Sequence, residues 1–453
     1  MPYSPSGREN TVEAVPTQLR QVLSELLAES LRSPLPSHTP RRVRGRTRFT
    51  GKVTAVVGMR RAGKTTFLHQ LRREWTREGE APFHAPYLSF EDDRLTGLET
   101  RHLDFLLDEY DRLSPSGPDS TAVMWCFDEV HLVPGWERFV RRLLDTRQVE
   151  VFVSGSSAAL LSREIATALR GRAWQVLIHP FSFEEALLHQ GIAVPGDPER
   201  LAREERMRLE RAFSAWLGTG GFPEAQGLDA ASRQQLLRDY VDVAILRDVV
   251  ERHSVSNVTG LRWLVRQLLG NAGSLFSVEK FHAAVKSQGL AIARDTVHRF
   301  LGYLEDCFLV RVVWMESGSE RQRMVNPRKV YPVDTGLIPL FDRTGRANVG
   351  HALETAVLVE LDRRRLDVTY VRTRKGYEVD FLVRSADGHR ELIQVCADAS
   401  DPVTAEREVR ALGAAGEAFP DARKLLLTLH RDGIPSELPD DVVAKPAYAW
   451  ALE

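Results

Sequence analysis

The stretch "KVTAVVGMRRAGKTTFLHQLRREW", residues 52–75, decides the fold of this 453-residue chain. Its residues 53–57 are apolar and mostly β-branched, which is typical of a buried parallel strand, and its later apolar residues recur at helical spacing. Between them lies the pattern G-x-x-x-x-G-K-T, in which glycines let backbone N–H groups surround phosphates at a helix N-terminus. The stretch therefore predicts an α/β fold with a phosphate-binding loop between a strand and a helix.

The residues that we expect to bind ATP lie in this loop and in the first turn of the helix. They are Gly58, Arg61, Ala62, Gly63, Lys64, Thr65 and Thr66. We expect the Lys64 ammonium to neutralise the β and γ phosphates and the Thr65 hydroxyl to bind Mg²⁺. Only eight of the 61 basic residues are lysines, so each lysine is more informative than an arginine.

An acidic pair follows a second apolar stretch, "TAVMWCFDEVH" at 121–131. Asp128 would hold the Mg²⁺ shell at the end of a strand. Glu129, one residue further, would orient or deprotonate the attacking water. A phosphate-binding loop with such a pair predicts ATP hydrolysis.

A third strand, "VEVFVSGSS" at 149–157, ends in small polar residues. A hydroxyl of Ser154 or Ser156 could sense the γ-phosphate, or could cap the helix that we expect next. The segment "LRGR" then offers Arg170 and Arg172 as candidates for stabilising transition-state charge, and the choice between them stays open.

Composition describes an ordinary globular protein, with 43% hydrophobic and 27% charged residues and a length that suggests about three domains. We expect a cytoplasmic protein without membrane contact, because no run approaches 18 apolar residues and the N-terminus lacks the order of a signal peptide. Three distant cysteines form neither a disulfide framework nor a zinc site. A formal charge of -1 excludes a global attraction to nucleic acid but allows a local basic face.

The N-terminal residues 16–32 have leucines and valine at helical spacing and predict an amphipathic helix that packs on another part of the chain. Residues 33–48 contain three prolines and an arginine run. We expect a solvated tether there rather than a contact with nucleic acid.

Residues 258–336 have winged-helix proportions, with three helices and the strands "LVRVVWM" and "RKVYPVD" as a wing. Ser277 would cap the N-terminus of the second helix. The exposed face of the third helix carries Arg294, His298 and Arg299, which could enter a major groove. Such domains also mediate protein contacts, so double-stranded DNA and a protein both stay open as partners.

The motifs "GMRRAGKTT", "CFDEVH", "VSGSSAALLSREIATALRGR" and "HPFSFEEAL" resemble the AAA-type ATPases of a large prokaryotic family with a C-terminal domain of unknown function. The resemblance continues through "GGFPE", "LRDYVDVAILRDVVER" and "KVYPVDTGL" and covers about residues 50–412. It implies that Ser156 is the sensor and Arg172 a phosphate-sensing arginine. The other nucleotide-site residues that it implies are Gly58, Gly63, Lys64, Thr65, Asp128 and Glu129.

The C-terminal helix 350–365 and the strands around "YEVDFLVR" and "RELIQVCAD" resemble the PD-(D/E)xK nuclease fold. Strand alternation would place Glu378 and Asp380 on one face and Val379, Phe381 and Val383 on the other.

By this nuclease resemblance Glu354 and Asp380 are the metal-binding acids, but the Glu-x-Lys positions read Gln394 and Cys396. A neutral amide and a thiol do not replace a carboxylate and a lysine, so we expect no cleavage, and Cys396 as a small buried residue. A displaced lysine or arginine beside Asp380, with Lys375 or Arg407 as candidates, would favour a nuclease instead.

Five segments follow from these patterns: 1–48, an amphipathic helix and basic linker; 49–190, an AAA-type P-loop core; 191–256, a helical lid; 257–345, a winged helix; and 346–453, a nuclease-like domain without activity. We expect an Mg²⁺-dependent ATPase that acts as a switch or motor on DNA or a protein. An ATP-regulated nuclease and a regulatory ATPase with slow hydrolysis are the alternatives, and a homo-oligomer stays open.

Overall fold

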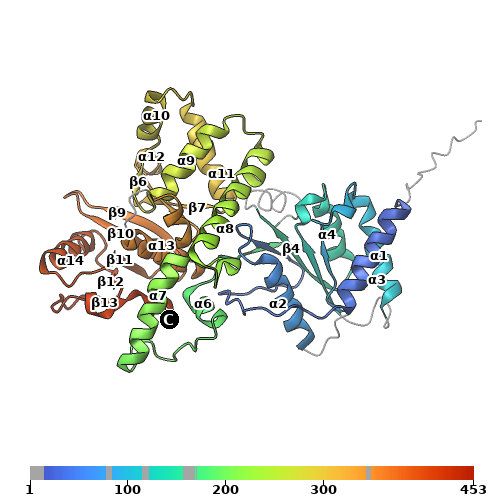
Figure 1. Ribbon diagram of the computed structural model, residues 1–453, viewed down its shortest axis with the longest axis horizontal. Coiled ribbons are helices and arrows are strands. Elements are labelled where there is room, and N and C mark those ends of the chain that lie inside the picture. Colours follow the sequence, from blue (N-terminus) through green and yellow to red (C-terminus); the bar gives the residue numbers. More distant parts are fainter. Residues whose placement is uncertain (1–14, 78–83, 115–121, 157–168, 170, 343–347) are drawn as a thin grey trace, which may run out of the picture.

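The chain forms two sheet-containing units with helices between them (Figure 1). The computed structural model describes residues 15–77, 84–114, 122–156, 169, 171–342 and 348–453. Within those residues no helix is long and apolar enough to cross a membrane. The N-terminal unit carries the predicted phosphate-binding loop, and the C-terminal unit carries the predicted nuclease-like residues.

Five parallel strands form the N-terminal sheet in the order β2-β3-β4-β1-β5. They are β1 (Val53–Val57), β2 (Tyr87–Ser89), β3 (Val123–Asp128), β4 (Val149–Gly155) and β5 (Ala173–Leu177). Every residue of β1 is buried, because strands pair with it on both sides and helices cover both faces. Since the strands are parallel, the carboxyl ends of β1, β3 and β4 meet at one edge.

Helices cover both faces of this sheet. They are α1 (Thr17–Arg32), α2 (Lys64–Arg77), α3 (Asp104–Leu113) and α4 (Trp136–Thr146), with the short turns η2 (Asp93–Leu95), η3 (Thr100–His102) and η4 (Val130–Leu132). Ala55 and Val57 pack with α1, α3 and α4, whereas Val56 points to the opposite face and packs with α2. The amphipathic helix predicted for 16–32 is confirmed as α1, which completes this core.

The linker after α1 corrects one expectation. Arg41 is buried, so this residue is not part of a solvated tether. Its backbone N–H donates to the Gln70 side chain, its guanidinium donates to the Ala62 carbonyl at 3.3 Å, and its Nε lies 3.4 Å from the buried Glu185 carboxylate. A buried carboxylate needs a cation, and Arg41 supplies it. Burial lowers the pKa of Arg41 to about 10, and the Glu185 carboxylate opposes that shift.

Eight strands form the C-terminal sheet in the order β13-β12-β11-β10-β9-β7-β8-β6. They are β6 (Leu275–Phe276), β7 (Val310–Met315), β8 (Arg328–Pro332), β9 (Asp367–Arg372), β10 (Glu378–Arg384), β11 (Arg390–Cys396), β12 (Arg423–Thr428) and β13 (Val442–Pro446). Strands β7 and β9 pair in parallel, with Trp314 opposite Thr369. The predicted winged-helix and nuclease-like segments therefore share one sheet.

Helices α13 (Val349–Arg363) and α14 (Pro402–Gly416) cover the two faces of this sheet. The short helix α15 (Ala447–Ala451) and the turn η7 (Thr335–Leu340) contact α13, and the turn η8 (Arg431–Gly433) contacts β13. The expectation that Val379, Phe381 and Val383 share a face is wrong for Val379. It packs with Leu382 on the α14 side, because the β9–β10 register shifts between Val379 and Leu382. Such a bulge interrupts strand alternation. Asp380 lies inside it.

The remaining helices are α6 (Phe183–His189), α7 (Arg203–Thr219), η5 (Pro223–Ala225), α8 (Ala230–Val243), η6 (Ala244–Glu251), α9 (Val258–Gly270), α10 (Val278–Ser287), α11 (Arg294–Asp306) and α12 (Glu320–Val325). Of these, α6 and α8 lie between the two sheets, whereas α9, α10 and α12 lie above the C-terminal sheet in this view (Figure 1). Within the segment expected as a lid, α7 packs on α13 and the C-terminal core, while η6 reaches the phosphate-binding loop. Helices α9, α10 and α11 and the paired strands β7 and β8 form where the sequence predicts them, and Ser277 caps α10.

Candidate functional site

The loop after β1 has a backbone shape that its glycines permit. Gly58 has φ +147° and Gly63 has φ +103°, values that other residues rarely adopt. A Cβ at Gly58 would also collide with the Ile178 carbonyl. Helix α2 begins at Lys64, directly after the loop. The N–H groups of its first turn therefore point toward the place where we expect phosphate.

Lys64 is buried, with 5% of its side chain exposed, and lies under the loop. Its Nζ donates to the carbonyl oxygens of Gly58 and Met59 at 3.2 and 3.3 Å. The Glu129 carboxylate is further away, at 3.7 Å. Neutral carbonyls and one distant carboxylate leave the ammonium able to bind an anion.

The predicted Mg²⁺ ligands lie together. The Thr65 hydroxyl donates to Asp128 Oδ2 at 2.7 Å, and the Tyr87 hydroxyl donates to the same oxygen at 2.8 Å. Ser154 donates to the other oxygen, Oδ1. Burial and the Asp128 charge raise the pKa of Tyr87, so its hydroxyl remains a donor. The hydroxyl and carboxylate oxygens fit a Mg²⁺ ion, which Thr65 and Asp128 would hold beside the phosphates.

Glu129, the predicted catalytic carboxylate, is buried beside Lys64. It follows β3 in a left-handed backbone conformation, with φ 51°, and its N–H donates to Ser154 Oγ at 2.9 Å. Its Oε2 accepts no hydrogen bond from the described residues, although His131 Nδ1 lies 3.3 Å away. Burial raises the pKa of Glu129, and Lys64 opposes this. Because burial lowers the pKa of His131 to about 4, that imidazole is neutral at pH 7.

A buried carboxylate on η6, Asp248, joins two parts of the nucleotide site. The Ser156 hydroxyl donates to it at 2.8 Å, and Arg60 of the loop donates Nε at 3.0 Å. Arg252, one turn further along, lies 3.5 Å away. Ser156, the predicted sensor, therefore contacts η6, while Ser154 contacts Asp128. We did not expect either role for Asp248 or Arg60 from the sequence.

Arg172 lies away from these residues. Its carbonyl accepts from the N–H of Val53 at the start of β1, the end opposite the loop, and its guanidinium pairs with Asp145. A role in phosphate sensing would therefore need a second copy of the chain, and it stays a prediction. Arg170, the alternative, lies outside the described residues.

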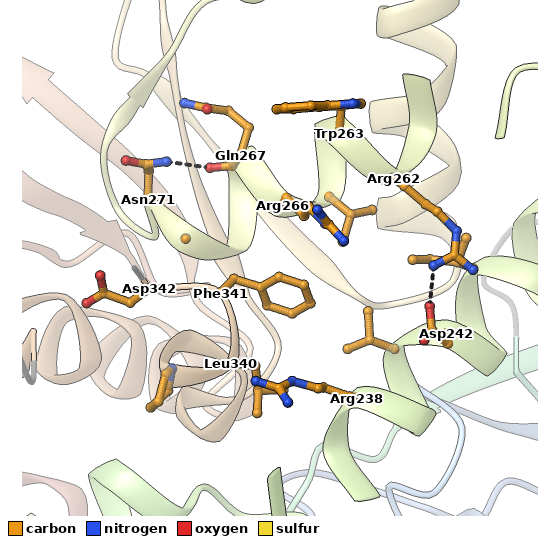
Figure 2. Close-up of a pocket in the computed structure, with 15 residues that line it drawn as sticks. Arg238, Asp242, Arg262, Trp263, Arg266, Gln267, Asn271, Leu340, Phe341 and Asp342 are labelled. Carbon is orange, nitrogen blue, oxygen red and sulfur yellow. Dashed lines mark hydrogen bonds and ion pairs between the residues drawn. The ribbon is translucent and has the colours of Figure 1, made fainter. Parts of the chain in front are cut away.

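A cleft of about 750 Å³ borders α8, η6 and α9 (Figure 2). Arg238 of α8 and Arg266 of α9 enter it from opposite walls, with Phe341 between them in this view. Arg262 is paired with Asp242 at 2.8 Å. The lining of the cleft holds three arginines, Arg238, Arg262 and Arg266, against two aspartates, Asp242 and Asp342, so its charge is positive by a small excess.

The predicted acids of the C-terminal unit converge on a lysine that we did not foresee. Nζ of Lys329 on β8 lies 2.9 Å from Glu354 on α13, 2.8 Å from Asp380 on β10 and 3.0 Å from Glu378. Both oxygens of Asp380 are occupied, because Oδ2 accepts from the Val395 N–H at 3.0 Å. In the described part of the chain no three His, Cys, Asp or Glu side chains are placed to hold a metal ion.

The residues at the Glu-x-Lys positions and the candidate replacements lie elsewhere. Gln394 is buried and donates to Glu408 at 2.8 Å. Cys396 is half-buried rather than buried, and burial raises the pKa of its thiol, which disfavours the nucleophilic thiolate. Arg407 pairs with Glu408, and Lys375 forms an exposed ion pair on the surface. Neither reaches Asp380.

Comparisons with known proteins give a family for the N-terminal unit. Residues 50–187 match the family described as AAA domain, and residues 210–345 match a domain of unknown function, DUF8612. An uncharacterized protein of Methanocaldococcus jannaschii is 31% identical over 412 residues, covering 88% of each chain. An uncharacterized protein of Haemophilus influenzae is 27% identical over 75% of this chain and 81% of its own length.

Among solved structures, a Walker-type ATPase of Pyrococcus abyssi is similar with a TM-score of 0.40 and 13% identity, over 71% of this chain and 95% of that one. At that score the likeness adds no detail to the site. The match to the M. jannaschii protein is strong enough to show a common family, because it extends over most of both chains. The chain belongs to one family with the M. jannaschii protein, and its N-terminal unit is an AAA-type P-loop ATPase domain.

Proposed function

We propose that this protein binds and hydrolyses Mg·ATP and uses the nucleotide state as a switch for its C-terminal unit. Lys64 offers a buried ammonium to the phosphates, and Thr65 and Asp128 offer Mg²⁺ ligands. Glu129 offers an acceptor for the attacking water. These groups supply the phosphate clamp, the metal ligands and the base of a phosphoryl-transfer site.

The observation that carries the switch is the position of Asp248. Its carboxylate, 1% exposed, accepts from Arg60 of the loop and from Ser156 after β4. A γ-phosphate offers the same two donors a competing anionic partner. Binding of ATP would therefore loosen η6 from the loop, and η6 continues toward α9 and the C-terminal unit.

Two isosteric variants test this proposal. Glu129→Gln should keep Mg·ATP affinity and lose turnover by about 100-fold or more, because it removes the base and not a phosphate ligand. Asp248→Asn should keep binding, but hydrogen exchange of residues 230–270 should no longer respond to ATP. A wild-type protein whose exchange in 230–270 is the same with and without ATP would contradict the switch.

The partner that we propose is DNA. Arg294, His298 and Arg299 are exposed on α11, although Arg294 pairs with Glu279 at 3.1 Å. The cleft adds Arg238, Arg262 and Arg266, which outnumber the two aspartates of its lining. Arginines on an otherwise neutral protein form a local site for backbone phosphates.

The DNA proposal is tested by the ATPase rate with and without double-stranded DNA, at two salt concentrations. We expect stimulation that falls with salt and that is lost in Arg238→Glu/Arg266→Glu. The matched control is Arg247→Glu, an exposed arginine of η6 outside the cleft. An unchanged rate would favour a protein partner.

The position of Lys329 bears on the alternative of an ATP-regulated nuclease. A basic residue beside Asp380 was expected to favour cleavage, but Lys329 is ion-paired with Glu354, Glu378 and Asp380 at once, so its ammonium is already neutralised by carboxylates. We therefore propose that neither single- nor double-stranded DNA is cut in Mg²⁺. Cleavage by the wild type that disappears in Asp380→Ala would overturn this proposal.

A further inference from the structure

We infer that Arg41 is a positioning residue for the phosphate-binding loop, and that Arg363 of the C-terminal unit controls it through a shared carboxylate, Glu185. Arg41 lies in the segment before β1, Glu185 lies on α6 and Arg363 lies on α13. Helix α6 lies between the two sheets (Figure 1). The inference rests on the proposed nucleotide function, but it follows a route separate from Asp248.

Arg41 contacts the loop from the interior of the protein. Its Nη1 donates to the Ala62 carbonyl at 3.3 Å, and a Cβ on Gly63 would lie 3.4 Å from the same nitrogen. The backbone N–H and carbonyl of Arg41 both bond the Gln70 side chain of α2, at 2.7 and 3.2 Å. Since Ala62 and Gly63 directly precede Lys64, Arg41 holds the part of the loop that would surround phosphate.

Glu185 is a buried anion with a cation on each side. Its Oε1 lies 3.4 Å from Nε of Arg41, and its Oε2 lies 3.6 Å from Nη1 of Arg363. Only 2% of the Glu185 side chain is exposed. Oε1 also accepts from the N–H of Arg42 at 2.8 Å, and Oε2 accepts from the N–H of Ser182 at 2.9 Å. The carboxylate is therefore fixed in place, and two guanidinium groups from different units share its charge.

The charge of Arg363 sets how strongly Glu185 attracts Arg41. Burial lowers the pKa of Arg41 to about 10, Glu185 opposes this shift and Arg363 adds to it, so Arg41 stays charged at pH 7. A guanidinium is attracted more strongly by a carboxylate than by a neutral carbonyl. Without Arg363, Glu185 would draw the Arg41 guanidinium away from the Ala62 carbonyl and loosen the loop.

The test compares Mg·ATP affinity and turnover of the full chain in wild type, Arg363→Met and the control Arg364→Met. Arg364 follows Arg363 in the chain and is equally buried, with 14% against 13% of the side chain exposed. It pairs with Glu360 at 2.9 Å, a carboxylate that Arg363 also approaches at 3.9 Å. The two variants therefore differ in the contact with Glu185.

We expect Arg363→Met to raise Kd and KM for Mg·ATP about tenfold and to keep kcat within about twofold, because the loop contact serves substrate and transition state alike. Arg364→Met should keep both constants. Arg363→Lys should restore most of the affinity, since it keeps the charge beside Glu185. A variant that is merely less folded has fewer active molecules, which lowers the apparent kcat and leaves KM unchanged.

Arg41→Lys should also weaken Mg·ATP binding, because a lysine lacks the guanidinium fork. Adding Arg363→Met to it should weaken binding little further, since both changes act through Glu185. Should Arg363→Met fail to fold, Arg363→Gln replaces it, because an amide can still donate to the Pro180 carbonyl that Arg363 contacts.

The outcomes separate this inference from the proposed function. A wild type that binds no Mg·ATP would contradict the proposed function. A wild type that binds Mg·ATP, with unchanged affinity in the Arg363 variant or an equal loss of affinity in Arg364→Met, would overturn this inference alone.

Discussion

Two buried lysines, Lys64 and Lys329, stand in acidic surroundings and have opposite roles. Lys64 donates to two loop carbonyls at 3.2 and 3.3 Å and lies 3.7 Å from its carboxylate neighbour. Lys329 contacts three carboxylates, none further than 3.0 Å. Lys64 has weak partners that a phosphate can replace, whereas the ammonium of Lys329 is already neutralised by three carboxylates. Burial and charge type alone therefore do not identify a ligand-binding lysine; the strength of its existing partners does.

The largest effect that we expect is on nucleotide affinity. Lys64→Ala should weaken Mg·ATP binding by about 1,000-fold, on the order of 4 kcal/mol, because it removes the charge that meets the phosphates. Calorimetry with Mg·ATP measures this, and Lys375→Ala on the surface is the control. The melting temperature should change little, since Lys64 loses only two carbonyl partners. If Lys64→Ala binds Mg·ATP as tightly as wild type does, Lys64 is not the phosphate-binding lysine and the contrast with Lys329 is wrong.

The second effect, on stability, has the reverse pattern. Lys329→Met should cost about 3 kcal/mol of unfolding free energy, because it leaves buried carboxylates without a counter-ion. Mg·ATP affinity should stay the same. Urea unfolding of the full chain, in wild type and in Lys329→Met, measures this loss of unfolding free energy. A stable variant with weakened ATP binding would show that the two lysines had been assigned the wrong way round.

Much of the N-terminal site was predictable, because its signal lies within short segments. The strand, the loop glycines, Lys64 and the Asp128–Glu129 pair each follow from local sequence, and parallel strands bring them to one edge. Asp248 was not predictable in this way, because its contacts to Arg60 and Ser156 join residues far apart in the chain. An acid among the apolar residues of η6 was the only local signal.

The C-terminal site shows where sequence reasoning ends. Glu354 and Asp380 were expected together and lie together, but the candidate replacements for the missing lysine were sought within 346–453. The lysine comes instead from β8, because β7 pairs with β9 and extends the sheet across the expected domain boundary. The bulge at Asp380 was equally hidden, since no glycine or proline marks it. The rarity of lysine was the one available signal for Lys329.

The smallest effect concerns pH. The pKa of Glu354 is raised from 4.5 to about 7, chiefly by burial and then by Asp380. A raised carboxyl pKa contributes stability that is fully present below 4.5 and is lost as pH rises through 7, roughly 2 kcal/mol between pH 5 and pH 8. Urea titrations at pH 5 and pH 8 should show this loss in wild type and not in Glu354→Gln. Burial also raises the pKa of Asp334 to about 6, and this residue changes the pH dependence of stability equally in wild type and in Glu354→Gln. An equal loss in the variant would exclude Glu354 as the cause.

The most direct measurement of the contrast between the two sites is the number of Mn²⁺ ions that the wild-type chain binds with and without ATP. Electron paramagnetic resonance counts them on the intact protein. We predict one Mn²⁺ per chain that depends on ATP, held by Thr65 and Asp128, and none at the Lys329 site. A Mn²⁺ ion bound without ATP and lost in Asp380→Asn would contradict the account, because Lys329 would then yield its place to a metal.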